Sequence, residues 1–231
     1  MSKGTLNSAI INSFNSEFEW HCMSLLTDAC ASVQSNHCID TDCKEEYISA
    51  VLFDHIDKSP QAAEWHIDIA PKYRKYVQAV LRKKKVKNIV SEISIQYGGW
   101  TNSADLEYFV AAQNVVEFIP PEKKKSRNPN PVIISDYHKR YIAIVDSFLS
   151  DKRRGCMIGY ILQGDTKYTV NCINHYLCDS NRVPEILKKR AVKLNGFDAC
   201  YVSVRKNRSM KHLMFNFSIN NNKTNYNQND E

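Results

Sequence analysis

The segment DLEYFVAAQN, residues 105–114, carries aromatic and β-branched side chains in close succession. This composition predicts a β-strand over residues 105–118. A Gly-Gly pair at residues 98–99 precedes it and predicts a turn. Before the turn, residues 88–97 alternate apolar and polar side chains, which is typical of a strand with one buried face. The sequence therefore predicts two consecutive strands joined by a turn.

Helical and strand-like segments alternate along the rest of the chain. Apolar residues at helical spacing predict helices over residues 5–33, 43–58, 71–82, 135–150, 166–178 and 183–192. Short apolar or alternating runs predict further strands over residues 65–69, 156–162, 199–204 and 210–217. This alternation favours an α/β fold. We divide the chain into an N-terminal helical extension (1–43), one domain (44–217) and a disordered Asn-rich tail (218–231).

The composition is that of a chain with one sizeable core. The sequence has 231 residues, of which 43% are hydrophobic. No apolar run approaches the roughly 20 residues that span a bilayer. The first residues lack the basic start and long apolar centre of a signal peptide. These features predict a soluble cytoplasmic protein without a membrane partner.

Eight cysteines occur in a chain for which no export is expected, so we predict reduced thiols. Several of them lie near histidines in the N-terminal region, which raises the question of a zinc site. There is no Cys-x-x-Cys pair, and metal sites usually show such tight paired spacing. We therefore expect no metal.

The basic residues are unevenly placed in a chain of net charge +6. Clusters of Lys and Arg neutralise the phosphates of a nucleic-acid backbone, although a single cluster is more often an ordinary solvated surface. Several clusters together favour binding to nucleic acid. The candidate residues are Lys83, Lys84, Lys85, Lys87, Lys152, Arg153, Arg154, Arg205, Lys206 and Arg208.

Three segments together resemble the bacterial restriction-endonuclease-like proteins with the PD-(D/E)XK motif. EYFVAAQNV (107–115) is similar to the family pattern Tyr-Phe-hydrophobic-Glu-Ala/Cys-Lys-Arg/Asn-Leu. GCMIGYILQGD (155–165) is similar to a Gly-Met-hydrophobic-Gly-Tyr strand and its Gly-Asp turn, and KHLMFNF (211–217) to a closing strand. The similarity covers residues 44–217. It implies a restriction-endonuclease-like mixed central sheet flanked by helices.

The resemblance also implies that the catalytic motif has degenerated. It places the first metal-binding acid at Ser94, the second at Ala111 and the phosphate-steadying Lys at Gln113. A methyl group cannot hold Mg²⁺, and a neutral amide supplies no positive charge. Glu46, on the first helix of the family pattern, and Glu92, two residues before Ser94, are the possible surviving acids.

The function expected from these features is that of a catalytically inactive nuclease-like subunit. It would bind nucleic acid, with DNA favoured, or an active partner in a bacterial defence or DNA-processing assembly, and it would need no cofactor. The alternative is an active DNA endonuclease with a displaced or experimentally inactivated site, which would use Mg²⁺ or Mn²⁺. A third class is a protein-interaction scaffold. A weaker option is a dyad of Cys156 or Cys172 with His138, His175 or His212.

Overall fold

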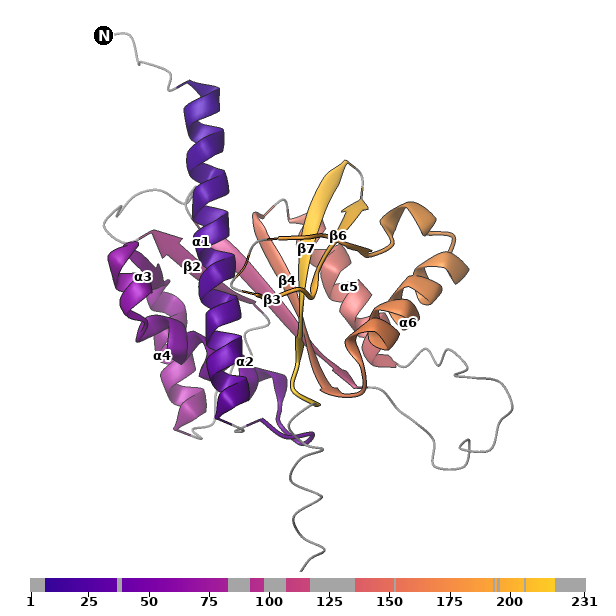
Figure 1. Ribbon diagram of the computed structural model, residues 1–231, viewed down its shortest axis with the longest axis horizontal. Helices are drawn as coiled ribbons and strands as arrows, with labels where there is room; N and C mark the ends of the chain where they lie inside the picture. Colours follow the sequence, from indigo (N-terminus) through magenta and orange to yellow (C-terminus); the bar gives the residue numbers. More distant parts are fainter. Residues whose placement is uncertain are drawn as a thin grey trace, which may run out of the picture.

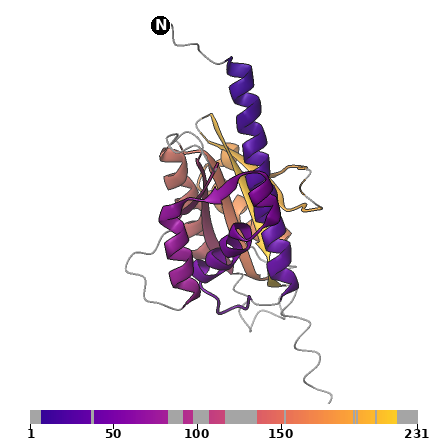
Figure 2. The ribbon, with the colours of Figure 1, turned by 90° about the vertical axis from the view of Figure 1, so that its left-hand side faces the viewer.

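The computed structural model describes residues 7–36, 39–82, 92–97, 107–116, 136–151, 153–192, 194, 196–205 and 207–218. Within these residues, helices lie on both faces of one seven-stranded mixed sheet (Figure 1, Figure 2). The predicted α/β class and the mixed sheet flanked by helices are confirmed at this level. No helix among the residues described is long and apolar enough to cross a membrane.

The strands are arranged in the order β1-β2-β3-β4-β7-β6-β5. Their bounds are β1 Ile67–Ile69, β2 Glu92–Tyr97, β3 Glu107–Val116, β4 Gly155–Gln163, β5 Lys188–Lys189, β6 Cys200–Arg205 and β7 Arg208–Asn216. β3, β4 and β7 run parallel to one another, and the other neighbours are antiparallel. Parallel strands need a crossover. α5 (Asp136–Ser150) connects β3 to β4, and α6 (Thr166–Asp179) follows β4 on the way to β7.

The two faces of the sheet carry separate sets of helices (Figure 1). α1 (Ser8–Ser35), α2 (Glu45–Asp57), α3 (Pro60–Glu64) and α4 (Pro71–Leu81) share a core with alternate residues of β2, β3 and β4. α5 and α6 cover the other face, where Ala111 and Val115 are buried. Side chains alternate along a strand, so successive residues of β3 belong to different cores.

The N-terminal helix is divided between core and solvent. Its first turns extend beyond the rest of the fold (Figure 2), and Ile10 is 58% exposed. From Phe18 onward the helix contributes buried side chains, including Leu25 and Leu26, to the core beside the sheet. The region expected to be an extension is therefore continuous with the domain through the second half of α1.

The predicted helix over residues 183–192 is wrong. A short 3-10 helix, Val183–Glu185, is followed by β5, which pairs with β6. The backbone N–H of Arg190 also donates to the carbonyl of Cys200 at 2.9 Å. Lys188 and Lys189 are exposed and contribute no apolar contact that would hold a helix on the core. Their backbone instead pairs with the edge of β6.

Two further expectations concern the thiols and the tail. Seven cysteines lie in the part of the chain that the structure describes; none of them forms a disulfide bond, and five are buried. Of the predicted tail only Ser218 lies within the described residues.

Candidate nucleic-acid interface

The two strands that carry the degenerate motif are hydrogen-bonded neighbours. In the antiparallel pairing of β2 with β3, Glu92 lies opposite Ala111, and Ser94 lies opposite Phe109. Residues directly opposite each other point to the same face, with Cβ atoms about 4.5–5.5 Å apart. Ser94, Glu92, Ala111 and Gln113 therefore share the face of the sheet on which α5 packs.

The positions assigned to metal binding are filled by the core. Ala111 and Ser94 are both 0% exposed. Ala111 belongs to the same buried cluster as Tyr141 of α5 and Met157 of β4. A bound Mg²⁺ usually keeps several water ligands, for which this packing leaves no space. Half-buried Gln113 uses its amide to donate to the carbonyl of Asn114 at 3.2 Å.

The acids on α2 lie on the other face of the sheet. Glu46 is on a helix whose apolar side packs in the opposite core, so it is not brought together with Ala111. Its neighbour Glu45 contacts β3, where its Oε2 accepts from the backbone N–H of Asn114 at 3.1 Å. Burial raises the pKa of Glu45 to about 7, although the hydrogen bond from Asn114 opposes this shift. Glu45 is therefore a partly buried carboxyl that connects α2 to β3 through a hydrogen bond.

Glu92 forms an ion pair with Arg153. Arg153 also contacts Asp151 at 2.9 Å, and its guanidinium carbon lies 5.1 Å from the centre of the Phe109 ring. Burial raises the pKa of Glu92, and the charge of Arg153 opposes this rise. No group of three or more His, Cys, Asp or Glu side chains suited to a metal ion occurs among the residues described. Glu92 thus acts here as the partner of an arginine.

Three arginines line a hollow of about 400 Å³, which we call the arginine hollow. They are Arg153, Arg154 and Arg208, and Glu19 also lines the wall. Arg208 donates to the backbone carbonyls of Leu149 and, at 3.1 Å, of Arg153.

The three arginines of this hollow differ in their partners, because Arg153 is paired with carboxylates and, among the residues described, the other two are not. Arg154 donates to the side-chain oxygen of Asn15. Within the described part of the chain, neither Arg154 nor Arg208 has a carboxylate partner, because their acceptors are neutral oxygens. Glu19 is itself paired with Lys211 at 2.6 Å. The hollow therefore keeps two arginines, Arg154 and Arg208, that form no ion pair with a carboxylate of the described residues.

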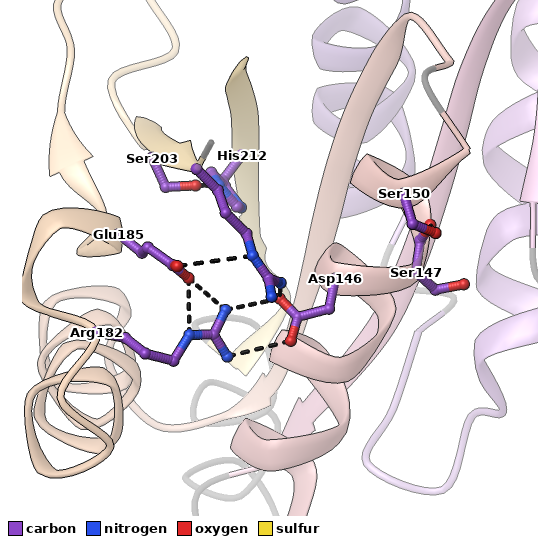
Figure 3. Close-up of polar contacts among 8 residues, drawn as sticks. Asp146, Ser147, Ser150, Arg182, Glu185, Ser203 and His212 are labelled. Atoms are coloured by element: carbon purple, nitrogen blue, oxygen red, sulfur yellow. Dashed lines mark hydrogen bonds and ion pairs between the residues drawn. The ribbon is translucent and has the colours of Figure 1, made fainter. Parts of the chain in front are cut away.

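Arg205 lies in a different environment. Figure 3 shows the ion-pair cluster formed by Asp146 of α5, Arg182 and Glu185, to which Arg205 of β6 also belongs. Arg182 contacts Asp146 at 2.7 Å, and Arg205 contacts both acids of the cluster. Two arginines and two carboxylates balance each other. Arg205 therefore connects β6 to α5 through ion pairs within the protein.

A hydrogen-bonded chain of three buried side chains lies beside this cluster. His212 Nδ1 lies 2.8 Å from the Tyr141 hydroxyl, and its Nε2 lies 2.8 Å from Ser203 Oγ. His212 and Tyr141 are 0% exposed, and Ser203 is 4% exposed. Burial lowers the pKa of His212 to about 3. A substrate cannot reach the buried Ser203 hydroxyl or the His212 imidazole. The hydrogen-bond partners of His212 are Tyr141 and Ser203, and neither is a cysteine. These three side chains are therefore part of the core.

The other basic candidates, Lys83, Lys84, Lys85, Lys87, Lys152 and Lys206, lie outside the described residues. Of the ten candidates, the structure brings Arg153, Arg154 and Arg208 together. Sequence reasoning did not indicate Asp146, Arg182 and Glu185 as a group, because no local pattern links them.

No family model, curated protein or solved structure matches this chain. The class that the geometry defines is an α/β protein built on a seven-stranded mixed sheet.

Proposed function

We propose that this chain is a catalytically inactive, restriction-endonuclease-like subunit that binds nucleic acid, preferably DNA, in a bacterial defence or DNA-processing assembly. The observation that carries the proposal is the arginine hollow, where Arg154 and Arg208 keep positive charges opposite neutral acceptors. The planar guanidinium group matches the oxygens of a phosphate with paired hydrogen bonds.

The strand arrangement supports the family assignment within this proposal. The resemblance places one metal-binding acid on each of two successive strands, and β2 and β3 are direct neighbours. The three segments that carry the resemblance lie on β3, β4 and β7, which are adjacent in the sheet.

The packing around the motif supports the absence of catalysis. Phosphodiester cleavage in this family uses a metal ion held by converging carboxylates. Ala111 and Ser94 are buried, and neither side chain carries a carboxylate. Glu92 forms an ion pair with Arg153. In this view, the strands of a nuclease site are retained as a scaffold beside a phosphate-binding surface.

The first test is DNA binding as a function of salt concentration, measured by fluorescence anisotropy with a labelled duplex. We expect the affinity to fall as salt rises, since phosphate contacts release counterions. Arg154→Gln should weaken binding and lower the slope of log K against log salt by about one. The control is Lys58→Gln, whose lysine lies at the end of α2 and pairs with Asp54. Binding that is absent, or unaffected by Arg154→Gln, would contradict the proposal.

The second test separates this proposal from an active endonuclease with a displaced site. The purified chain is incubated with plasmid and single-stranded DNA in Mg²⁺ or Mn²⁺, next to its Glu92→Ala variant. We expect no cleavage by either protein. Cleavage by the unmodified chain that is lost in Glu92→Ala would establish the alternative.

A further inference from the structure

A second hollow, of about 270 Å³, lies between α1, α3 and the end of β2, and none of its residues belongs to the arginine hollow. Its walls include Phe14, Glu17, His21, Glu64, Trp65 and Tyr97. We call it the aromatic-acidic pocket. The sequence gives no sign of it, because its residues come from three separate segments of the chain.

The rings of this pocket hold one another in defined orientations. The Phe14 ring packs edge-on against Tyr97, with 5.8 Å between ring centroids. His21 stacks on Trp65 with 4.0 Å between centroids and 23° between the ring planes. His66, which also lines the pocket, has a left-handed backbone with φ of 54°, a conformation that is uncommon for a residue other than glycine. The aromatic wall is therefore built by tertiary packing.

The acids of the pocket are available to a ligand. Glu17 and Glu64 are exposed, and neither forms an ion pair with any other residue that the structure describes. Burial lowers the pKa of His21, although the charge of Glu17 opposes this shift, so burial disfavours a positive charge on the imidazole. Aromatic faces attract cations through their quadrupole, and carboxylates attract them by charge. The two features together select an organic cation.

The surface next to the pocket is apolar. Ile10 and Ile11 on the projecting turns of α1 are 58% and 43% exposed, and Phe14 is 37% exposed. Residues three and four apart on a helix are neighbours, so this apolar strip continues into the pocket wall at Phe14. A free polyamine would leave the strip uncovered. A polypeptide with a basic residue beside an apolar one would cover both features.

We propose that the aromatic-acidic pocket binds the guanidinium group of an arginine presented by a partner protein. The rings stack on the planar group, Glu17 and Glu64 accept its hydrogen bonds, and the apolar strip of α1 holds an adjacent apolar side chain. Arginine fits better than lysine because its planar, weakly hydrated group stacks on aromatic rings. This docking site does not depend on the proposed nucleic-acid binding.

The test uses intrinsic tryptophan fluorescence, because Trp65 lines the pocket. The probes are the peptide acetyl-Leu-Arg-Leu-amide and the same peptide with citrulline, which keeps the shape of arginine without its charge. We expect the arginine peptide to bind at least about tenfold more tightly. Equal binding of the two peptides, or binding of neither, would overturn the proposal.

Variants locate the binding and separate it from a structural effect. Glu17→Gln and Glu64→Gln, on different helices, should each weaken the arginine peptide roughly three- to tenfold without lowering the melting temperature. Asp198→Asn, which removes an exposed carboxylate elsewhere, should leave peptide binding unchanged. Salt-dependent DNA binding should be the same in Glu17→Gln and in the unmodified chain. Peptide affinities unaffected by both glutamate variants would place the peptide elsewhere and overturn the assignment.

Two other occupants have distinct outcomes. Spermidine that binds more tightly than the arginine peptide would reassign the pocket to a free polyamine. Concentration-dependent self-association abolished by Glu17→Gln, measured by sedimentation velocity, would show that a second copy of the chain occupies the pocket. Either result would overturn the proposal of a partner protein.

Discussion

At Ala111 a single methyl group stands where the resemblance implies a metal-binding carboxylate, and α5 covers it. The arginines show that residue type alone does not decide availability. The charge of Arg205 is balanced by the carboxylates of Asp146 and Glu185. The charge of Arg154 lies opposite the neutral amide oxygen of Asn15. Whether an arginine belongs to an internal ion pair or remains open to the phosphate contact that we propose thus depends on the partners around it.

The buried imidazole of His212 makes stability depend on pH. Its pKa is about 3 in the folded chain, against about 6.5 when unfolded, so the unfolded state takes up a proton first as pH falls. The contribution of His212 is fully present above pH 6.5 and declines toward pH 3. We expect a loss of about 2 kcal/mol in the free energy of unfolding between pH 7 and pH 5 from this group.

Urea denaturation at pH 7 and pH 5 tests this expectation. His212→Gln should reduce the difference in unfolding free energy between the two pH values by about 2 kcal/mol, whatever its stability at pH 7. Buried His138, whose pKa burial lowers to about 4, contributes in the same direction and keeps some dependence in the variant. An unchanged difference in His212→Gln would mean that this imidazole has the same pKa in the folded and the unfolded chain, which would contradict the expected shift.

At the scale of the elements, the parallel pairing of β3 with β4 joins two central strands of the sheet in a fixed register. Gly159 pairs with Gln113, and Gly155 pairs with Phe109 at the start of β4. A Cβ atom at Gly155 would lie 1.8 Å from the backbone oxygen of Phe109, so the strands approach too closely there for any side chain. The glycine at position 155 is therefore explained by the close packing of β4 against β3.

We expect Gly155→Ala to lower the free energy of unfolding by about 3 kcal/mol, because backbone oxygen cannot move aside. The matched control is Gly159→Ala, where the nearest obstacle is the Met214 sulfur at 2.6 Å. A thioether on a flexible side chain can shift, so the cost should be about 1 kcal/mol. Chemical denaturation of both variants measures the difference, and equal costs would contradict the close approach of β3 and β4.

At the scale of the whole molecule, α1 belongs to the domain even though its first turns project from it (Figure 1). Its second half shares a core with α2, α4 and the sheet. Its first half presents Ile10 and Ile11 to solvent beside the aromatic-acidic pocket. One helix thus provides both stability and an exposed surface.

Two alanine substitutions separate these roles. Leu26→Ala, at a fully buried position, should lower the free energy of unfolding by about 3 kcal/mol, because it removes apolar contacts and leaves a cavity. Ile10→Ala, at a position 58% exposed, should change it by less than about 0.5 kcal/mol. If thermal and chemical denaturation showed little effect of Leu26→Ala, α1 would be an extension outside the cooperative domain.

The sequence by itself determined the class of the fold and most of its elements. The helices at Glu45–Asp57, Asp136–Ser150 and Thr166–Asp179 and the strands at Glu107–Val116 and Gly155–Gln163 follow their predicted ranges within a few residues. The helical and strand periods appear in residues that are close together in the sequence, so local patterns of apolar residues reveal helices and strands. The helix predicted over 183–192 failed because an edge of the sheet, which is not local, offered better hydrogen bonds.

Only the tertiary structure decided which face each residue of β3 points to, which arginines are neutralised and which part of α1 enters the core. Glu92 and Arg153 are 61 residues apart, and the pocket on α1 joins Glu17 to Glu64 and Tyr97. Such contacts depend on how the helices pack on the two faces of the sheet, and no sequence period encodes that packing. The physical reason is that charge balance and burial are properties of neighbours in space, whereas secondary structure is set mainly by neighbours in the chain.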